Sequence, residues 1–147
     1  MAQPADLTEN EIREFVVAWY KKLDTHDPMV ELLPLVADSD LEMVFPEATV
    51  KGHAGFESWY QRVIRTFFDE EHTVKETRIV EPGERPRVKI VVNWQARVWD
   101  PPAAKSKWLG FDAYQTWVVE RSPTTGKPVI RTYVVDELKP MPGSASL

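Results

Sequence analysis

Three polar residues of types that move protons or hold oxygen atoms occur in otherwise apolar stretches of the chain. His72 follows "RTFFDEE", Asp136 lies in "VIRTYVVDEL", and Gln115 lies in "WLGFDAYQTWVVE". Imidazole and carboxylate groups act as general acids and bases, and a carboxamide both donates and accepts hydrogen bonds. Proton transfer on a bound small molecule is therefore one hypothesis, and purely structural roles are the other.

Several other chemistries lack the residues that they need. The chain has no cysteine, and its three histidines show no metal-ligand spacing, so we expect no metal site. His26 and His53 precede predicted helices, where surface or capping roles are more usual. The sequence contains neither a glycine-rich phosphate loop nor a G-x-S-x-G nucleophile motif.

The composition is that of an ordinary globular domain. With 147 residues, 43% hydrophobic and 28% charged, the chain predicts a single domain over residues 1–147. The net charge of −5 argues against nucleic acid and anionic membranes as partners. No apolar run approaches about 20 residues and the N-terminus has no signal pattern, so we expect no membrane span and a cytoplasmic location.

The first half of the chain predicts helices. "LTENEIREFVVAWYKKLD" begins with a capping-box pair, Thr8 and Glu11, and carries apolar residues at helical spacing. Residues 25–40 predict a second helix that Pro34 shortens or kinks, and residues 53–71 predict a third. Between them, "LEMVFP" alternates like a short strand.

The second half predicts four antiparallel strands joined by short turns, over residues 72–80, 87–99, 108–120 and 129–138. Three helices followed by a meander indicate an α+β fold with the helices on one face of a curled sheet. On this assignment His72 opens the first of the four strands.

Strand alternation sorts the side chains of the meander into two faces. If residues of the central hairpin pair when their numbers sum to about 207, one face is apolar apart from Gln115. This glutamine is either bonded to backbone near a sheet edge or aimed at a ligand. The same alternation places Asp136 inward with Ile130 and Leu138. Asp136 is then either wet at the end of the sheet or a carboxylate at a cavity mouth. His72 is likewise either solvent-facing at a helix end or directed into an aromatic cavity.

The layout resembles the nuclear transport factor 2-like superfamily, and more narrowly a SnoaL-like domain. The resemblance rests on "WYKKLD", "FPEATVKGHAGFESWY", "DEEHTV" and "YVVDEL", and spans about residues 8–139, the expected ordered core. It implies a cone: a strongly bent antiparallel sheet and three N-terminal helices enclosing an apolar pocket. It also implies that Tyr20 and His72 correspond to residues of the dehydratases and Asp136 to an aspartate of the cyclases, with no cofactor.

Two hypotheses for function follow. In the first, the protein is a cofactor-independent isomerase, dehydratase or cyclase with His72, Asp136 and Tyr20 as catalytic residues. Its hydrophobic substrate, of aromatic or polycyclic type, would contact Trp19, Phe45, Trp59, Phe67, Trp94, Phe111, Gln115 and Trp117. In the second, the same fold is a non-catalytic binding or dimerisation module, and the tryptophans either leave a pocket or fill the core.

The sequence also predicts a homodimer. The face of the sheet opposite the helices would carry an apolar and aromatic set that seldom stays in water: Val91, Trp99, Trp108, Tyr114, Val118, Tyr133 and Val135. Sheet-to-sheet pairing is also what the family resemblance implies.

Overall fold

The structure is a computed structural model that describes residues 6–147. The helices are α1 (Glu9–Asp24), α2 (Met29–Leu32), a short 3₁₀ turn η1 (Leu33–Leu35) and α3 (Gly52–Thr66). The strands are β1 (Glu42–Val44), β2 (Thr49–Lys51), β3 (Phe67–Glu81), β4 (Arg87–Val98), β5 (Lys107–Arg121) and β6 (Pro128–Pro140). The α+β class predicted from the sequence is confirmed.

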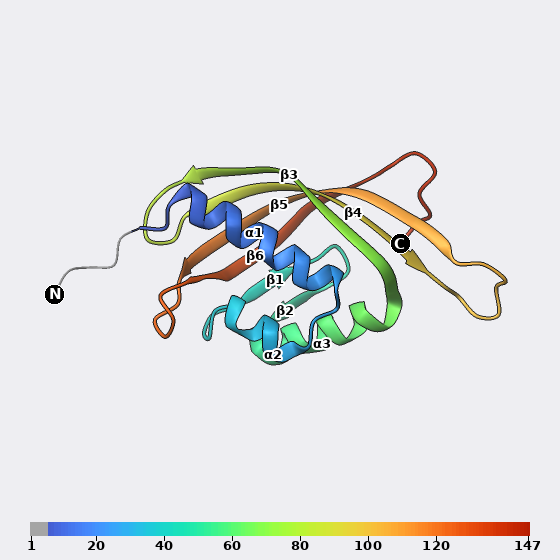
Figure 1. Ribbon diagram of the computed structural model, residues 1–147, viewed down its shortest axis with the longest axis horizontal. Helices are drawn as coiled ribbons and strands as arrows, with labels where there is room; N and C mark the ends of the chain where they lie inside the picture. Colours follow the sequence, from blue (N-terminus) through green and yellow to red (C-terminus); the bar gives the residue numbers. More distant parts are fainter. Residues whose placement is uncertain (1–5) are drawn as a thin grey trace.

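All six strands form one curved sheet in the order β2-β1-β6-β5-β4-β3. The long strands arch over α1, while α2 and α3 lie at the opposite end of the curve (Figure 1). The expectation of a wholly antiparallel sheet needs one correction, because β1 runs parallel to β6. These two strands are far apart in the chain, so no tight turn forces them to be antiparallel. The three-residue strand β2 was not predicted.

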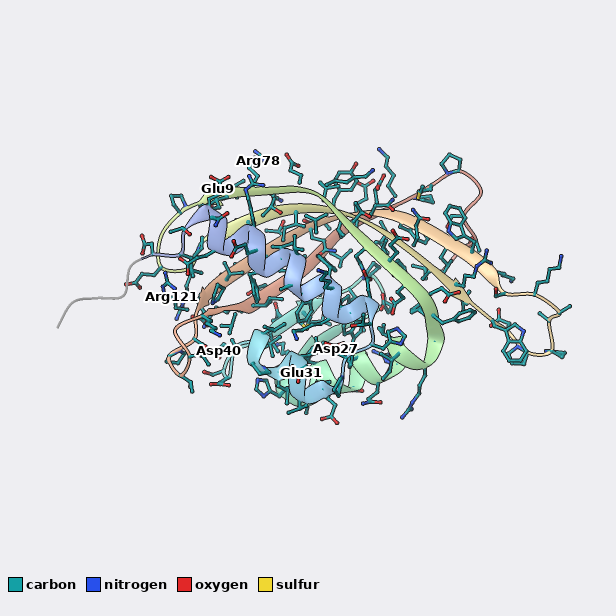
Figure 2. All side chains as sticks on the ribbon, in the orientation of Figure 1. Glu9, Asp27, Glu31, Asp40, Arg78 and Arg121 are labelled. Atoms are coloured by element: carbon teal, nitrogen blue, oxygen red, sulfur yellow. The ribbon has the colours of Figure 1, made fainter. Side chains whose placement is uncertain are left out.

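Helix α1 is fixed at its first turn by the predicted capping box. The Thr8 hydroxyl accepts from the Glu11 backbone, and the Glu11 carboxylate accepts from the Thr8 backbone, both at 3.1 Å. Arg121 of β5 pairs with the same carboxylate at 2.9 Å and lowers the pKa of Glu11. Figure 2 shows Arg121 beside this end of the helix. Sheet and helix are therefore joined where α1 begins.

The end of α1 has its own polar contacts. Lys22 pairs with Asp27 at 3.7 Å and with Glu31 at 3.5 Å, linking α1 to the loop and to α2. Asp27 and Glu31 lie together beneath this end of the helix (Figure 2). The backbone carbonyl of Asp27 accepts from the Tyr60 hydroxyl of α3 at 2.5 Å. These contacts bring all three helices together at one end of the sheet.

The boundary between α3 and β3 differs from the predicted one. The helix ends at Thr66 and the strand begins at Phe67, so "FFDEE" is strand and not helix. His72 therefore lies inside β3 and does not open it. Asp69 has a positive φ of 52° at a break in the β3–β4 register between Phe68 and Glu71. This bulge bends the strand where it leaves the helix.

The central hairpin confirms the predicted faces but not the register. Paired residues of β4 and β5 sum to 205, as in Val88 with Trp117, and not to 207. A shift of two residues leaves every side chain on its face. The helix-facing set is accordingly buried: Val88, Ile90, Val92, Ala96, Leu109, Phe111, Ala113, Gln115, Trp117 and Val119.

The predicted faces of β6 are wrong over its middle. Breaks in the β5–β6 register at Arg131 and Asp136 each add one residue to β6, and each reverses the alternation. Tyr133 and Val135 consequently face the helices, opposite Trp117 and Gln115. Asp136 does not.

One polar cluster crosses the core between α1 and the sheet. Gln115 Oε1 accepts from the Trp117 indole at 2.8 Å and from the Tyr20 hydroxyl at 2.9 Å. The Tyr20 oxygen lies 3.1 Å from the Tyr133 hydroxyl. Because the single Tyr20 proton is used on Gln115, Tyr133 must donate to Tyr20. Burial raises the pKa of Tyr20 well above its usual range and that of Tyr133 to about 12.

This cluster predicts a loss of stability at high pH. Between the ordinary tyrosine pKa of 10.0 and the folded value of about 12 for Tyr133, the unfolded chain releases a proton that the folded chain keeps. Stability from this group is complete below pH 10 and falls as pH rises toward 12, by up to about 1.4 kcal/mol per pH unit. Urea unfolding from pH 8 to 11 should therefore show a shallower decline for Tyr133→Phe than for wild type.

Tyr114→Phe is the matched control, because it removes a phenol from the exposed face of the sheet without touching the cluster. Equal slopes for wild type and Tyr133→Phe would contradict the proposed burial effect.

Candidate active site

A cavity of about 560 Å³ lies between α3 and the concave face of the sheet. Its walls are mainly apolar and aromatic, and its polar members come from four elements. The lining residues are Leu23, Phe45, Pro46, Glu47, Trp59, Arg62, Val63, Thr66, Phe67, Glu70, His72, Val92, Trp94, Ala113, Gln115, Tyr133, Val135, Leu138 and Leu147. The volume is in the range of sites for drug-sized ligands.

The structure separates the predicted lining residues into two groups. Phe45, Trp59, Phe67, Trp94 and Gln115 line the cavity. Trp19, Phe111 and Trp117 do not, and they are buried in the protein interior at 0%, 6% and 0% exposure. The aromatic residues thus do both things that the sequence left open: some fill the core, and the others wall a cavity beside it.

His72 lines the cavity and forms a close pair with Asp24, the last residue of α1. The imidazole Nδ1 lies 2.5 Å from Asp24 Oδ1, and the His72 backbone N–H donates to Asp24 Oδ2 at 3.0 Å. The His72 side chain is only 9% exposed. Its ring lies between those of Tyr20 and Trp94, with centroids at 4.6 Å and 6.3 Å. Both the orientation and the position of the imidazole are therefore fixed.

The Asp24 contact also determines which imidazole nitrogen is free. A carboxylate only accepts hydrogen bonds, so Nδ1 carries the proton and Nε2 of the neutral ring is an acceptor. Among the described hydrogen bonds of residues 6–147, none involves Nε2, and His72 is one of the residues that line the cavity. The arrangement is that of a general base whose conjugate acid is stabilised by a carboxylate behind it.

A second histidine–carboxylate pair adjoins the first, with the roles reversed. Glu70 lines the cavity with its side chain 2% exposed, and its Oε2 contacts His26 Nε2 at the protein surface. The other oxygen, Oε1, accepts from the Trp94 indole at 3.1 Å. In this pair the carboxylate faces the cavity and the imidazole lies behind it.

Asp136 does not join the site. Its side chain is 43% exposed on the outer face of the sheet, where Thr116 donates to it at 2.6 Å and Lys89 lies 3.8 Å away. The prediction that it shares a cavity with His72 is wrong. The physical reason is the bulge at Arg131, which reverses the alternation of β6 from that point, while the second bulge at Asp136 restores it for Leu138.

Tyr20 supports two cavity-lining residues, His72 and Gln115, without lining the cavity itself. It stacks on His72 but does not line the cavity, and its hydroxyl proton is used on Gln115. The Gln115 amide orientation is unambiguous, because an indole N–H only donates and the atom 2.8 Å from Trp117 must be oxygen. A side-chain hydrogen bond of Gln115 also lowers the pKa of Tyr133, and Gln115 lines the cavity, where a ligand can reach its amide.

Sequence reasoning missed Asp24, Glu70 and His26 as site residues. Asp24 continues the inward series Ile12, Val16, Tyr20 at intervals of four, and a carboxylate at a helix C-terminus is electrostatically disfavoured. Either signal could have identified it. Glu70 shares strand alternation with His72, but its segment was assigned to the preceding helix.

The described residues contain neither a candidate metal site nor a helix suited to crossing a membrane. No group of three or more His, Asp or Glu side chains within residues 6–147 is placed to hold a metal ion. None of the helices in that range is long and apolar enough to cross a membrane.

Comparisons with known proteins give structural matches only. No family profile and no protein of curated function matches the sequence. Hexachlorocyclohexane dehydrochlorinase LinA-type3 of Novosphingobium barchaimii superposes with a TM-score of 0.72 at 15% identity, covering 94% of this chain and 92% of its own. A candidate dehydratase of the NTF2-like family from Streptomyces avermitilis gives 0.71 at 14% identity, with coverage of 90% and 95%.

A candidate SnoaL-like polyketide cyclase of Shewanella denitrificans gives a TM-score of 0.64 at 14% identity, covering 86% of this chain and 89% of its own. Identities this low establish the fold and nothing finer. The chain has the cone-shaped α+β fold of the NTF2-like proteins, as the sequence resemblance implied.

Proposed function

We propose that the protein is a small acid–base enzyme in which His72 removes a proton from a carbon atom of a hydrophobic ligand. The observation that carries this proposal is the His72–Asp24 pair on the wall of a 560 Å³ apolar cavity. A base oriented by a carboxylate, facing a largely apolar space of ligand size, meets the usual geometric criteria for a catalytic site.

The proposed step uses only groups that the chain supplies. The lone pair of His72 Nε2 takes a ligand proton, and the electrons of the broken C–H bond form a double bond to the neighbouring atom. The pair displaced from that atom moves along an existing double bond in an isomerisation, or departs with a leaving group in an elimination. Asp24 then stabilises the imidazolium. Return of the proton to another atom gives isomerisation, and departure of a leaving group gives elimination. The names of the structural neighbours, a dehydrochlorinase and a dehydratase among them, are consistent with elimination.

Gln115 and Tyr20 have supporting roles in this proposal. The Gln115 amide, which lines the cavity, donates to an oxygen or another acceptor of the ligand. Tyr20 is a positioning residue, since its hydroxyl orients Gln115 and its ring supports His72. Its raised pKa keeps it neutral through the physiological range.

Replacing the base tests the proposal directly. A thermal-shift screen of aromatic, polyketide-like and steroid-like ring compounds selects a ligand, because binding to the folded state alone raises the midpoint. NMR in D2O then measures exchange of its carbon-bound hydrogens. His72→Gln should lower the exchange rate by about 10²- to 10⁴-fold. Asp24→Asn should lower it as well, because Asp24 accepts two hydrogen bonds from His72 and an amide has only one acceptor oxygen. With its NH2 group toward Nδ1, the amide would place the imidazole proton on Nε2.

His53→Gln is the matched control, since this histidine contacts the Ala37 carbonyl at 3.0 Å and does not line the cavity. Ligand binding by His72→Gln shows that the variant is folded. Exchange at the wild-type rate in that variant would rule out His72 as the base, and a wild type that gives no exchange above the protein-free rate would reduce the protein to a non-catalytic binding module.

Truncating Trp117 and Trp94 distinguishes a residue that fills the core from one that lines the cavity. Trp117 is fully buried, so Trp117→Ala should lower the free energy of unfolding by about 3–5 kcal/mol. Trp94 borders empty space, so Trp94→Ala should be less destabilising but should weaken binding of the selected ligand. Urea unfolding and ligand titration of both variants measure these effects. Equal destabilisation with unchanged affinity would argue against a ligand cavity at this position.

We also propose a homodimer formed through the outer face of the sheet. Phe68, Trp99 and Tyr114 are 40%, 51% and 37% exposed there or next to it. Tyr133 and Val135 leave the predicted surface, because they face the cavity. A twofold contact of ordinary size would bury roughly 1,600 Å². Sedimentation equilibrium at tens of micromolar protein should give twice the mass of one chain. Tyr114→Lys should shift the measured mass toward that of the monomer. A monomeric wild type would refute the dimer.

A further inference from the structure

The Glu70–His26 pair has features that the proposed proton abstraction by His72 does not use. Glu70 is an ionisable side chain at 2% exposure, and burial of a carboxylate is unfavourable unless other groups compensate for it. His26 and the Trp94 indole supply two hydrogen bonds, one to each oxygen. A carboxylate has about four acceptor positions, so acceptor capacity remains on the side that faces the cavity.

The backbone on both sides of this pair adopts an unfavourable conformation. His26 has φ of 50° and Asp69, directly before Glu70, has φ of 52°. Residues other than glycine rarely adopt this left-handed backbone conformation, and those that do are often found at functional sites. The first conformation turns the loop after α1 toward β3. The second forms the bulge after which Glu70 and His72 face the same side.

The negative charge of Glu70 also acts on Tyr60 of α3. The pKa of Tyr60 is raised to about 12 by burial first, and then by the charges of Asp27 and Glu70. Arg62, the one arginine or lysine among the described cavity-lining residues, makes no ion pair with Glu70 among the described contacts. The described hydrogen bonds to Glu70 come from His26 and Trp94, and the side facing the cavity remains an acceptor.

We infer that Glu70, held by His26, receives a hydroxyl group of the ligand, so that the substrate class is a hydroxylated ring compound. This inference rests on the proposed function, since it concerns the same cavity. Glu70 and His72 are two residues apart on one face of β3, about 6.5–7 Å between their Cα atoms. The ligand hydroxyl and the carbon that loses its proton therefore lie along the same edge of the ligand.

Three ring compounds of nearly equal size test the inference: naphthalene, 2-naphthol and 2-methoxynaphthalene. Only 2-naphthol donates a hydrogen bond, while the methoxy compound keeps the oxygen. Wild type should bind 2-naphthol at least about tenfold more tightly than 2-methoxynaphthalene, as expected for a hydrogen bond to a charged group. In Glu70→Gln the ratio should fall to within about threefold. Isothermal titration calorimetry gives the dissociation constants.

Glu71→Gln is the matched control, because this neighbouring carboxylate is exposed on the other side of β3, and it should keep the wild-type ratio. Naphthalene binding reports whether Glu70→Gln is folded. A readout that needs no variant is the Trp94 indole N–H resonance, which should shift with 2-naphthol more than with the methoxy compound, since this group donates to Glu70.

The outcomes separate the two proposals. Binding of all three compounds with equal affinity, or a preference that survives in Glu70→Gln, would overturn the hydroxyl site and leave the role of His72 intact. Failure of every compound to bind wild type would instead count against the cavity as a ligand site and against both proposals.

Discussion

The junction between the end of α1 and strand β3 determines the rest of the site. Two residues from the helix end, Asp24 and His26, meet two residues of the strand, His72 and Glu70, in two crossed imidazole–carboxylate pairs. Each pair compensates for burying ionisable groups that would be unfavourable alone. Because the pairs have opposite orientation, an imidazole and a carboxylate face the cavity side by side.

The aromatic residues divide the interior into a solid part and a hollow part. Trp19 of α1 packs against both Phe56 and Trp117, with ring centroids 5.8 Å and 6.2 Å apart. The Phe45–Trp59 stack and Trp94 form walls around empty space instead. Stability therefore comes mainly from the first group, and the second is free to be shaped by a ligand. This division explains how a domain this small supports a cavity of useful size.

The sequence was informative where periodicity continued without interruption. The α1 face, the central hairpin and the inward position of Gln115 followed from helical spacing and strand alternation. Prediction from the sequence failed where a bulge inserts an extra residue into a strand, and where the boundary between a helix and a strand was misplaced. The bulge at Arg131 reversed a face of β6, and the helix assigned through "FFDEE" concealed Glu70. Bulges depend on contacts between distant strands, so a local pattern does not reveal them. The Asp24–His72 pair spans 48 positions and needed the fold itself.

The hydrogen bonds that join Tyr133, Tyr20, Gln115 and Trp117 have fixed donors and acceptors. Trp117 and Tyr20 both donate to an amide oxygen, and Tyr133 donates to Tyr20. An amide oxygen has no proton to pass on and the indole nitrogen accepts none, so this set of hydrogen bonds does not reverse and does not relay protons. These buried side chains therefore offer no path for protons from the cavity into the protein interior. A proton taken by His72 must return to the ligand, leave through the mouth, or pass along the Asp24 side, and it does not escape through the core.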